Sequence, residues 1–260
     1  MISRSTDIKA ALRSRQRGFL LNPFRFGGGG GGGGVDPHFA NVSLLMHMDG
    51  TDGGTTFVDS GPLGLTPITV TSATTRPGSA VYGSGGMLLP GTSSNGVTFT
   101  HATAFQFATS EAFTIEMMVR LERPVAGSSY DYLLHMSTSG GGHTGGLYMR
   151  WSDSGFGQEF QCAIDDTLRV SGFNRTSAYN NYASIAYCRK SDGVTTLFVN
   201  GVGVSTTSNG RVLNATHVRV GCALNNGFPT KASVDELRIT KGVCRYTENY
   251  TPATAPFPNS

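Results

Sequence analysis

Closely spaced carboxylates are the first residues to examine, because two of them on one strand are the machinery of a retaining glycosidase. Such an enzyme holds its carboxyl groups about 5 to 5.5 Å apart, a separation close to that of residues i and i+2 on a strand. No Glu-x-Asp pattern is present: Met118 stands two residues after Glu116, while Asp165-Asp166 and Asp235-Glu236 are adjacent pairs that point to opposite faces of a regular strand. The sequence predicts no enzyme and no catalytic residue.

Metal and phosphate sites are not indicated either. The histidines show no helical pairing and no near neighbours apart from His38 and His47, so structural or surface roles are expected. Gly140-Gly141-Gly142 and Gly145-Gly146 flank His143, but the lysine and the helix that a phosphate loop requires are missing. We expect a flexible loop there, no metal site and no cofactor.

A lectin-like site requires an aromatic face to stack on a sugar and amides to fix its hydroxyl groups, usually on loops at one rim. The loops over residues 174–182 and 225–228 have this composition, and Trp151 is the one tryptophan. The candidate ligand-binding residues are Trp151, Tyr179, Asn180, Asn181, Tyr182, Asn225 and Asn226. The alternative is that these are ordinary polar loops with one or two aromatic rings packed against the domain.

The four cysteines are expected to be reduced thiols that pack as small apolar side chains. Cys162, Cys188, Cys222 and Cys244 lie inside or beside strand-like runs, and none shows Cys-x-x-Cys spacing. Residues 2–17 contain no apolar stretch of a secretory signal, and no run of about 18 apolar residues could span a membrane. The expectation is a protein made in a cytoplasm, soluble, without membrane insertion.

The candidate residues are carried by a chain of short strands. Residues 113–121 have apolar side chains at every odd position, with Thr114, Glu116 and Arg120 on the even ones, which predicts a half-buried central strand. Leu237–Thr240 and Thr196–Val199 repeat this alternation, which implies long-range antiparallel pairing. Asn200-Gly201 is a strong hairpin signal, because a type I′ turn needs positive φ at both positions.

Many short strands at this spacing are typical of a sandwich or jelly roll. The fold is therefore predicted to be an all-β antiparallel jelly-roll sandwich, one domain over residues 35–260. The other expected strands are Val42–Met48, Thr55–Val58, Ile68–Thr71, Val97–Thr100, Tyr132–Met136, Leu147–Trp151, Phe160–Ile164, Leu168–Phe173, Ala183–Arg189, Val218–Cys222 and Val234–Thr240. The proline-rich end, residues 251–258, is expected to lie extended on the surface.

The first 34 residues differ from the rest. Eight consecutive glycines, residues 27–34, cannot hold structure alone and are interpreted as a linker that spans about 16 Å. Residues 1–26 form an N-terminal arm that either folds back on its own domain or, as we favour, docks on another protein. Its apolar docking residues are Phe19, Leu20, Leu21, Phe24 and Phe26.

The energetics of the arm favour a homo-oligomer. Burial of the five apolar side chains gives roughly 7 to 15 kcal/mol, and ordering eight residues costs about 1 to 2 kcal/mol each. One arm alone should bind weakly, so several arms in one assembly, or strand addition to the partner, would be needed.

Charge argues against a nucleic-acid partner. The net charge is +3, but residues 1–34 contain six basic residues and one acidic residue, so the remainder is slightly acidic. A nucleic-acid binder needs a basic stripe across its folded part.

Three segments together resemble a known family. They are Val42–Gly50 with Phe57–Ser60, then Phe113–Glu116, then Val234–Gly242 with Arg245-Tyr246 and the proline-rich end. These segments resemble the concanavalin A-like, laminin-G-type jelly roll, from about Asp36 to the C-terminus, and look most like the version carried by tailed-bacteriophage virion proteins. The family includes lectins, adhesion modules, glucanases and phage structural proteins, so the fold alone does not settle the function.

The resemblance implies a bacteriophage virion protein that is made in the bacterial host cytoplasm. Its arm would hold it on other virion proteins, and its domain would attach to a host-surface glycan in the manner of a tail fibre or tail tip. The alternatives are a capsid or tail decoration protein without external ligand and, more distantly, a glycoside hydrolase. Related modules sometimes hold calcium, for which Asp49, Asp52 and Asp59 could supply oxygens, but turn-capping is the commoner role and the metal stays unassigned.

Overall fold

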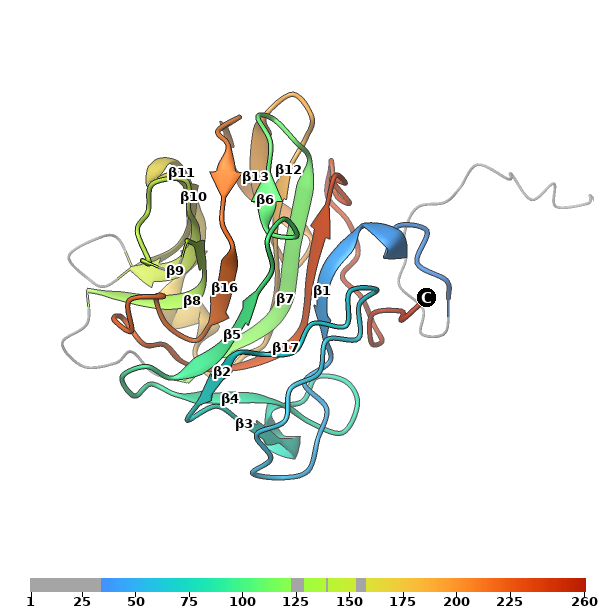
Figure 1. Cartoon of the computed structure of the whole chain (residues 1–260), viewed down its shortest axis with the longest axis vertical. Helices are drawn as coiled ribbons and strands as arrows, with labels where there is room; N and C mark the ends of the chain where they lie inside the picture. Colours follow the sequence, from blue (N-terminus) through green and yellow to red (C-terminus); the bar gives the residue numbers. More distant parts are fainter. Residues whose placement is uncertain (1–33, 123–128, 139, 153–157) are drawn as a thin grey trace, which may run out of the picture.

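The computed structural model describes residues 34–122, 129–138, 140–152 and 158–260. These residues form two antiparallel β-sheets packed face to face, as predicted for a jelly-roll sandwich (Figure 1). The predicted docking arm and residues 27–33 of the glycine linker lie outside the described residues.

Within the described residues, one sheet has eight strands and the other has seven. In spatial order the eight-stranded sheet contains β14 (Val202–Ser208), β13 (Val194–Val199), β12 (Ala183–Arg189), β7 (Phe113–Leu121), β17 (Lys231–Lys241), β4 (Gly86–Pro90) and β3 (Thr74–Arg76), with β1 (Val42–Met46) beside β17. The seven-stranded sheet contains β11 (Thr167–Asn174), β10 (Glu159–Ile164), β9 (Leu147–Ser152), β8 (Tyr130–Ser137), β16 (His217–Val220), β5 (Gly96–Thr100) and β2 (Thr69–Thr71). The short strands β6 (Gln106–Phe107) and β15 (Leu213–Asn214) pair separately, and 3-10 turns cover Phe39–Asn41, Pro77–Ser79 and Arg175–Ala178.

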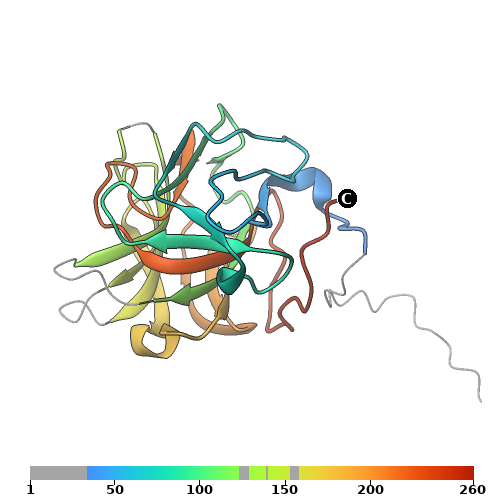
Figure 2. The ribbon, with the colours of Figure 1, turned by 90° about the horizontal axis from the view of Figure 1, so that it is seen from below.

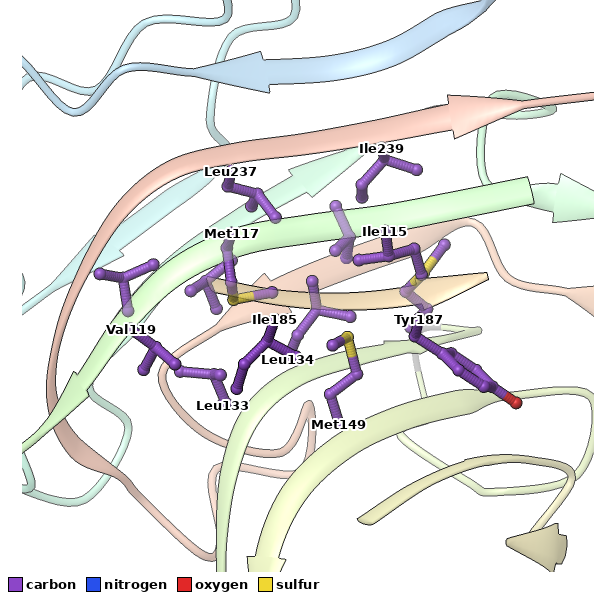
Figure 3. Packing of buried hydrophobic residues seen from close by; sticks show 14 of the residues in the cluster. Ile115, Met117, Val119, Leu133, Leu134, Met149, Ile185, Tyr187, Leu237 and Ile239 are labelled. Carbon is purple, nitrogen blue, oxygen red and sulfur yellow. The ribbon is translucent and has the colours of Figure 1, made fainter. Parts of the chain in front are cut away.

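Strand β7 is central, as its alternation predicts. It pairs with β12 on one side and β17 on the other, so the predicted pairing with Leu237–Thr240 is confirmed. Ile115, Met117 and Val119 are at most 1% exposed and point into the core between the sheets (Figure 3). The core is one contiguous apolar cluster that draws on both sheets.

The Asn200-Gly201 hairpin is also confirmed. Val199 pairs with Val202 across the turn, and Asn200 and Gly201 have φ values of 50° and 78°. By contrast, the expected strand at Thr55–Val58 does not form, because in this stretch only Phe57 is buried and the segment crosses the surface as an irregular loop.

The outer face of β7 is not solvent-exposed, which corrects the prediction of a wet face. Thr114 is 0% exposed and Glu116 is 3% exposed. Thr114 Oγ1 donates to the carbonyl of Val243 at 3.1 Å, and the Tyr246 hydroxyl donates to Glu116 at 2.7 Å. The C-terminal segment, residues 242–260, therefore covers this face, a role that the strand's own alternation cannot reveal.

The two ends of the described chain are fastened at one place. Asp36 accepts hydrogen bonds from Arg238 at 3.1 Å and from Arg245 at 2.8 Å, and its amide donates to the carbonyl of Ser260 at 2.6 Å. Burial opposes ionisation, but the bonds from Arg245 and the charge of Arg238 lower the pKa of Asp36 overall. Asp36, near the start of the described chain, is therefore held beside the C-terminus.

Candidate functional site

The outer face of the seven-stranded sheet carries aromatic and polar side chains. Along β9, Leu147, Met149 and Trp151 point into the core, so Tyr148 and Arg150 point outward. Tyr132 of β8 lies directly opposite Arg150, and His135 lies opposite Tyr148. Side chains at such cross-strand positions are near neighbours, so the pairing register alone assembles an aromatic and polar cluster.

Arg150 lies at the centre of this cluster. Its Nη1 donates to the Tyr132 hydroxyl at 2.6 Å, and its Nε donates to Gln161 at 3.3 Å. Its guanidinium carbon lies 3.7 Å from the ring centroid of Tyr130 and 4.0 Å from that of Tyr148. Stacking of a cation between two aromatic faces at these distances is attractive, especially when desolvated. The rings are therefore held in fixed orientations.

The glycine-rich segment around residues 140–146 folds onto this face. His143 Nε2 lies 3.0 Å from the Tyr132 hydroxyl, and the two rings are stacked with centroids 6.1 Å apart. Gly141 and Gly145 have positive φ values of 67° and 64°, a conformation that glycine adopts at no steric cost. The prediction of a flexible loop missed this role, which is to carry His143 to the aromatic cluster.

A second loop reaches the cluster from the connection between β16 and β17. The ring of Phe228 stacks on Tyr132, with centroids 5.5 Å apart and an interplanar angle of 26°, and its carbonyl accepts from the Tyr132 amide at 2.9 Å. Phe228 is 39% exposed, so one part of the ring packs on the cluster and the rest faces solvent.

Charged groups lie at one edge of the cluster. Asp166 accepts from the Tyr148 hydroxyl and from Arg169, both at 2.8 Å, and lies 3.7 Å from His143 Nδ1. Burial opposes ionisation of Asp166, but the hydrogen bonds from Arg169 and Tyr148 lower its pKa overall. Asp166 is thus an ionised acceptor at neutral pH.

His135 is neutral beneath this surface. Burial, together with the nearby His143 and Arg150, lowers the pKa of His135 to about 3. Its Nδ1 accepts from the amide of Leu224 at 3.1 Å, which places the ring proton on Nε2. His135 therefore anchors the β16–β17 loop that presents Phe228.

The predicted residues Asn225 and Asn226 belong to this loop and are exposed. Asn225 Oδ1 accepts from the amide of Gly227 at 3.1 Å, and Asn226 Oδ1 accepts from Arg219 at 2.7 Å. Both carbonyl oxygens shape the loop, and both residues are exposed beside Phe228. The accessible surface thus combines an aromatic face, amides and charged groups, the composition that suits stacking on a sugar ring and hydrogen bonding to hydroxyls.

Trp151 is placed elsewhere, and its proposed ligand role needs correction. It is 0% exposed and packs in the core against Phe160 and Phe173, with centroids 4.8 and 5.4 Å away. The reason is the alternation of side chains along the strand: Trp151 shares the inward face of β9 with Met149, so its ring is not accessible to a ligand at the surface.

The loop at residues 175–182 is organised for structure. Tyr182 donates to the carbonyl of Ser79 at 2.6 Å and lies under the guanidinium of Arg120, while Tyr179 packs against the core. Asn180 and Asn181 are exposed, and the amide of Asn180 donates to Leu121 at the end of β7. The loop contacts both sheets, because Arg175 bonds to Asp131 of β8 and to the carbonyl of Ser152 of β9 in the seven-stranded sheet.

Sequence reasoning missed the cluster residues Tyr130, Tyr132, His135, Tyr148, Arg150, Asp166 and Arg169. A signal existed: Tyr130-x-Tyr132 and Tyr148-x-Arg150 place aromatic and basic side chains on one face of two consecutive strands. Only the pairing register shows that these faces adjoin.

The carboxylates considered as catalytic candidates make hydrogen bonds and ion pairs within the fold. Glu116 is bound by Arg238 at 2.9 Å and by Tyr246, and Glu236 pairs with His47 at 2.8 Å. Asp235 accepts from the amides of Val81 and Tyr82, and burial raises its pKa to about 7. Strand β17 is irregular here, with a φ of 53° at Glu236, and Val234 and Leu237 both face the core. Asp235 and Glu236 therefore both lie on the outer side of the sheet, which corrects the prediction that they point to opposite faces, although each binds a different segment.

The three aspartates considered for calcium are not gathered as ligands. Asp49 accepts hydrogen bonds from Ser84 and Gly85, and Asp59 accepts from the amides of Leu45, Gly61 and Leu65. In the parts of the chain that the structure describes, no group of three or more metal-ligating side chains comes together.

No described helix has the length and apolar character needed to cross a membrane. A cavity of about 350 Å³ lies away from the aromatic cluster, beside His47, Asp49 and the C-terminal residues 256–260. Its lining includes His47 and Asn259, whose side chains contact each other and hold the C-terminal segment on the domain.

Comparison with solved structures supports the fold. The binding domain of botulinum neurotoxin serotype G aligns with a TM-score of 0.58 at 14% identity, covering 79% of this chain and 49% of that one. A structure of botulinum neurotoxin type C, whose cell entry is described as dependent on two ganglioside molecules, aligns with a TM-score of 0.59 at 10% identity over 80% of this chain and 50% of that one. Trypanosoma rangeli sialidase aligns with a TM-score of 0.54 at 10% identity, covering 85% of this chain and 31% of that one.

The chain thus spans about half or less of these proteins, and at such identities the likeness shows the fold alone. No curated protein matches the sequence. The model of the concanavalin A-like lectin/glucanases superfamily, in its laminin-G form, matches residues 90–247. Since this match covers more than half of the chain and agrees with the two-sheet architecture, the protein belongs to the concanavalin A-like lectin/glucanase superfamily.

Proposed function

We propose that the protein is a lectin-type attachment module of a bacteriophage particle, with its glycan-binding surface on the outer face of the seven-stranded sheet. The observation that carries the proposal is the aromatic and polar cluster around Arg150, with Phe228 exposed above it. We call the exposed part, formed by His143, Asp166, Asn225, Asn226 and Phe228, the aromatic rim.

The position of the rim fits an attachment role. The β16–β17 loop lies on the left side of the molecule in both views, and the C-terminus lies on the right (Figures 1 and 2). Since Asp36 is bonded to Ser260, the start of the folded domain lies beside the C-terminus. A domain held through its N-terminal arm would therefore present the aromatic rim away from the point of attachment.

One structurally similar protein is described as interacting with glycolipids. Cell entry of botulinum neurotoxin type C is described as dependent on interaction with two ganglioside molecules. That statement concerns a protein twice as long as the aligned region, so the inference for this chain rests on its own aromatic rim.

A glycan array probed with the full-length protein tests the binding part. We expect binding to one or more glycans, and Phe228→Ala should weaken it about tenfold or more, which is a loss of about 1.4 kcal/mol. The contact between the Phe228 carbonyl and the Tyr132 amide is a backbone bond and survives the substitution. Val204→Ala, an exposed apolar residue on β14, is the matched control and should bind normally.

A decoration protein without external ligand is the second candidate, and burial within the cluster favours it. Tyr132 and Tyr148 are each 1% exposed and Arg150 is 3% exposed, as expected if the cluster serves only to stiffen the sheet. An array with no binding, or equal binding by the wild-type protein and Phe228→Ala, would favour this candidate over a lectin.

We also propose that the domain is not a glycosidase. The support is that Glu116, Asp235 and Glu236 are each committed to other partners. A reducing-sugar assay on β-glucans should give no product above the buffer control.

The virion part of the proposal rests on the sequence of residues 1–34. The five apolar arm residues would dock on another virion protein, and several copies acting together would supply the avidity that one arm lacks. Removing residues 1–34 should leave a folded domain that no longer enters particles, because Asp36 and the segments that bind it are retained. Purified virions carrying the truncated gene, blotted for the protein, measure this directly, and undiminished incorporation would show that the folded domain makes the virion contact.

A further inference from the structure

The four cysteines are free thiols, and Cys188 and Cys244 pack in one small cluster on the outer face of the eight-stranded sheet. Cys188 lies on β12, where its register partners are Thr114 of β7 and Thr196 of β13. It is 1% exposed and belongs to a small cluster with Ala186 and Phe198 beneath the C-terminal segment.

Cys244 is held over Cys188 by its own neighbours in the chain. Thr114 Oγ1 donates to the carbonyl of Val243 at 3.1 Å and accepts from the amide of Arg245 at 2.8 Å. Because Thr114 and Cys188 are cross-strand partners, whose Cβ atoms lie about 4.5 to 5.5 Å apart, both residues that flank Cys244 are fixed next to Cys188. Cys244 packs against the cluster that contains Cys188, and its thiol donates to the carbonyl of Tyr246 at 3.3 Å.

The two thiols differ in reactivity. Cys244 is partly exposed, and its interaction with the neighbouring Cys188 lowers its pKa despite partial burial. Burial raises the pKa of Cys188, as it does for the core residues Cys162 and Cys222. Since the thiolate is the nucleophile in disulfide exchange, Cys244 is the residue that should react first.

We propose that Cys188 and Cys244 are a thiol pair that closes to a disulfide by exchange with a low-molecular-weight disulfide such as glutathione disulfide. The Cys244 thiolate attacks one sulfur of glutathione disulfide, the sulfur–sulfur bond of that molecule breaks, and one glutathione thiolate leaves. Cys188 then gives up its proton and attacks the Cys244 sulfur of the mixed disulfide, which releases the second glutathione. The two protein thiols lose two electrons, and glutathione disulfide gains them.

This disulfide would attach the C-terminal segment covalently to β12 of the eight-stranded sheet. Residues 242–260 cover Thr114 and Glu116, and Arg245 holds Asp36, so the cross-link would lock the cover over the face where the chain ends meet. The long loop between the two cysteines makes a large stabilisation expected, because it removes much freedom from the unfolded chain. The inference concerns the opposite sheet from the aromatic rim and does not depend on the ligand.

The test is oxidation of the full-length protein. Protein purified under reductant should give four alkylated thiols by intact mass, and after incubation with glutathione disulfide it should give two. Tryptic digestion without reductant should release residues 176–189 linked to residues 242–245. The melting temperature should rise by roughly 5 to 15 °C.

Two variants serve as controls. Cys244→Ala should keep its three thiols and show no rise in melting temperature on oxidation. Cys222→Ala, which lacks a buried cysteine outside the pair, should fall from three thiols to one and show the wild-type rise. Four thiols retained in the wild-type protein, one glutathione that persists on Cys244, or a link between two chains would each overturn the proposal.

Discussion

At the residue scale, neighbouring positions on β7 have different environments for reasons that lie outside the strand. Ile115 points into the core between the sheets, where it is surrounded by apolar side chains (Figure 3). Thr114 points the other way but is buried too, because its hydroxyl bonds to the carbonyl of Val243 and the amide of Arg245.

Both positions should therefore be sensitive to substitution. Ile115→Ala should cost about 2 to 5 kcal/mol, the usual effect of a core cavity. Thr114→Ala should cost about 1 to 3 kcal/mol, because two buried backbone groups lose their partner. Urea denaturation of both variants measures this.

Thr206→Ala, on the exposed edge strand β14, is the control and should change stability by no more than about 0.5 kcal/mol. A Thr114→Ala variant as stable as that control would mean that residues 243–245 do not rest on β7 in solution.

At the element scale, the C-terminal segment is fastened by a titratable contact. His47 Nδ1 lies 2.8 Å from Glu236, and Glu236 accepts from the amide of Phe257 at 2.8 Å. His47 Nε2 lies 2.6 Å from Asn259. The bond to Glu236 raises the pKa of His47 above 6.5, against the opposing effect of burial.

A raised pKa sets the sign of the pH dependence. The contribution of protonated His47 to stability is complete below the unfolded-state pKa of about 6.5 and is lost as the pH rises through the higher folded-state pKa. The stability difference between the wild-type protein and His47→Gln should therefore be larger at pH 5.5 than at pH 9.

Denaturation of both proteins at these two pH values measures the difference, and hydrogen exchange at the Phe257 amide should accelerate at pH 9 beyond the intrinsic base-catalysed rate. Comparison with the variant removes the contribution of Asp235, whose pKa of about 7 also titrates in this range. A difference that grows with pH would contradict the assigned ion pair.

Elements with a strong local signal could be predicted from the sequence. The alternation in β7 and the Asn200-Gly201 turn specify a strand and a hairpin without help from the rest of the chain. Strand β4 was not predicted from the sequence, because Gly86 and Pro90 at its ends are residues typical of turns. Met87 and Leu89 between them are nevertheless fully buried.

The candidate site was less predictable, because it depends on which strands are neighbours. Trp151 has the right chemistry to stack on a sugar, but the pleat directs it inward. Tyr148, one pleat position away from Met149, faces the cluster with Arg150. Period-2 alternation separates two faces of a strand, but it does not say which face a covering loop will bury.

At the scale of the whole molecule, the C-terminus and the β16–β17 loop that carries Phe228 lie on opposite sides (Figure 2). The buried bonds of Asp36 to Arg238 and Arg245 hold the end of the glycine linker, and the β16–β17 loop holds Phe228. A tethered binding domain needs this separation, because a ligand must be reached while the arm is docked. The location of ligand binding is therefore the central claim.

The most direct test is hydrogen exchange of the full-length protein with and without the glycan that gives the strongest array signal. The account predicts slower exchange in residues 140–146 and 222–229, with residues 36–46 and 242–260 unchanged. Protection confined to residues 175–182 or to the chain ends, or no protection anywhere at saturating glycan, would contradict it.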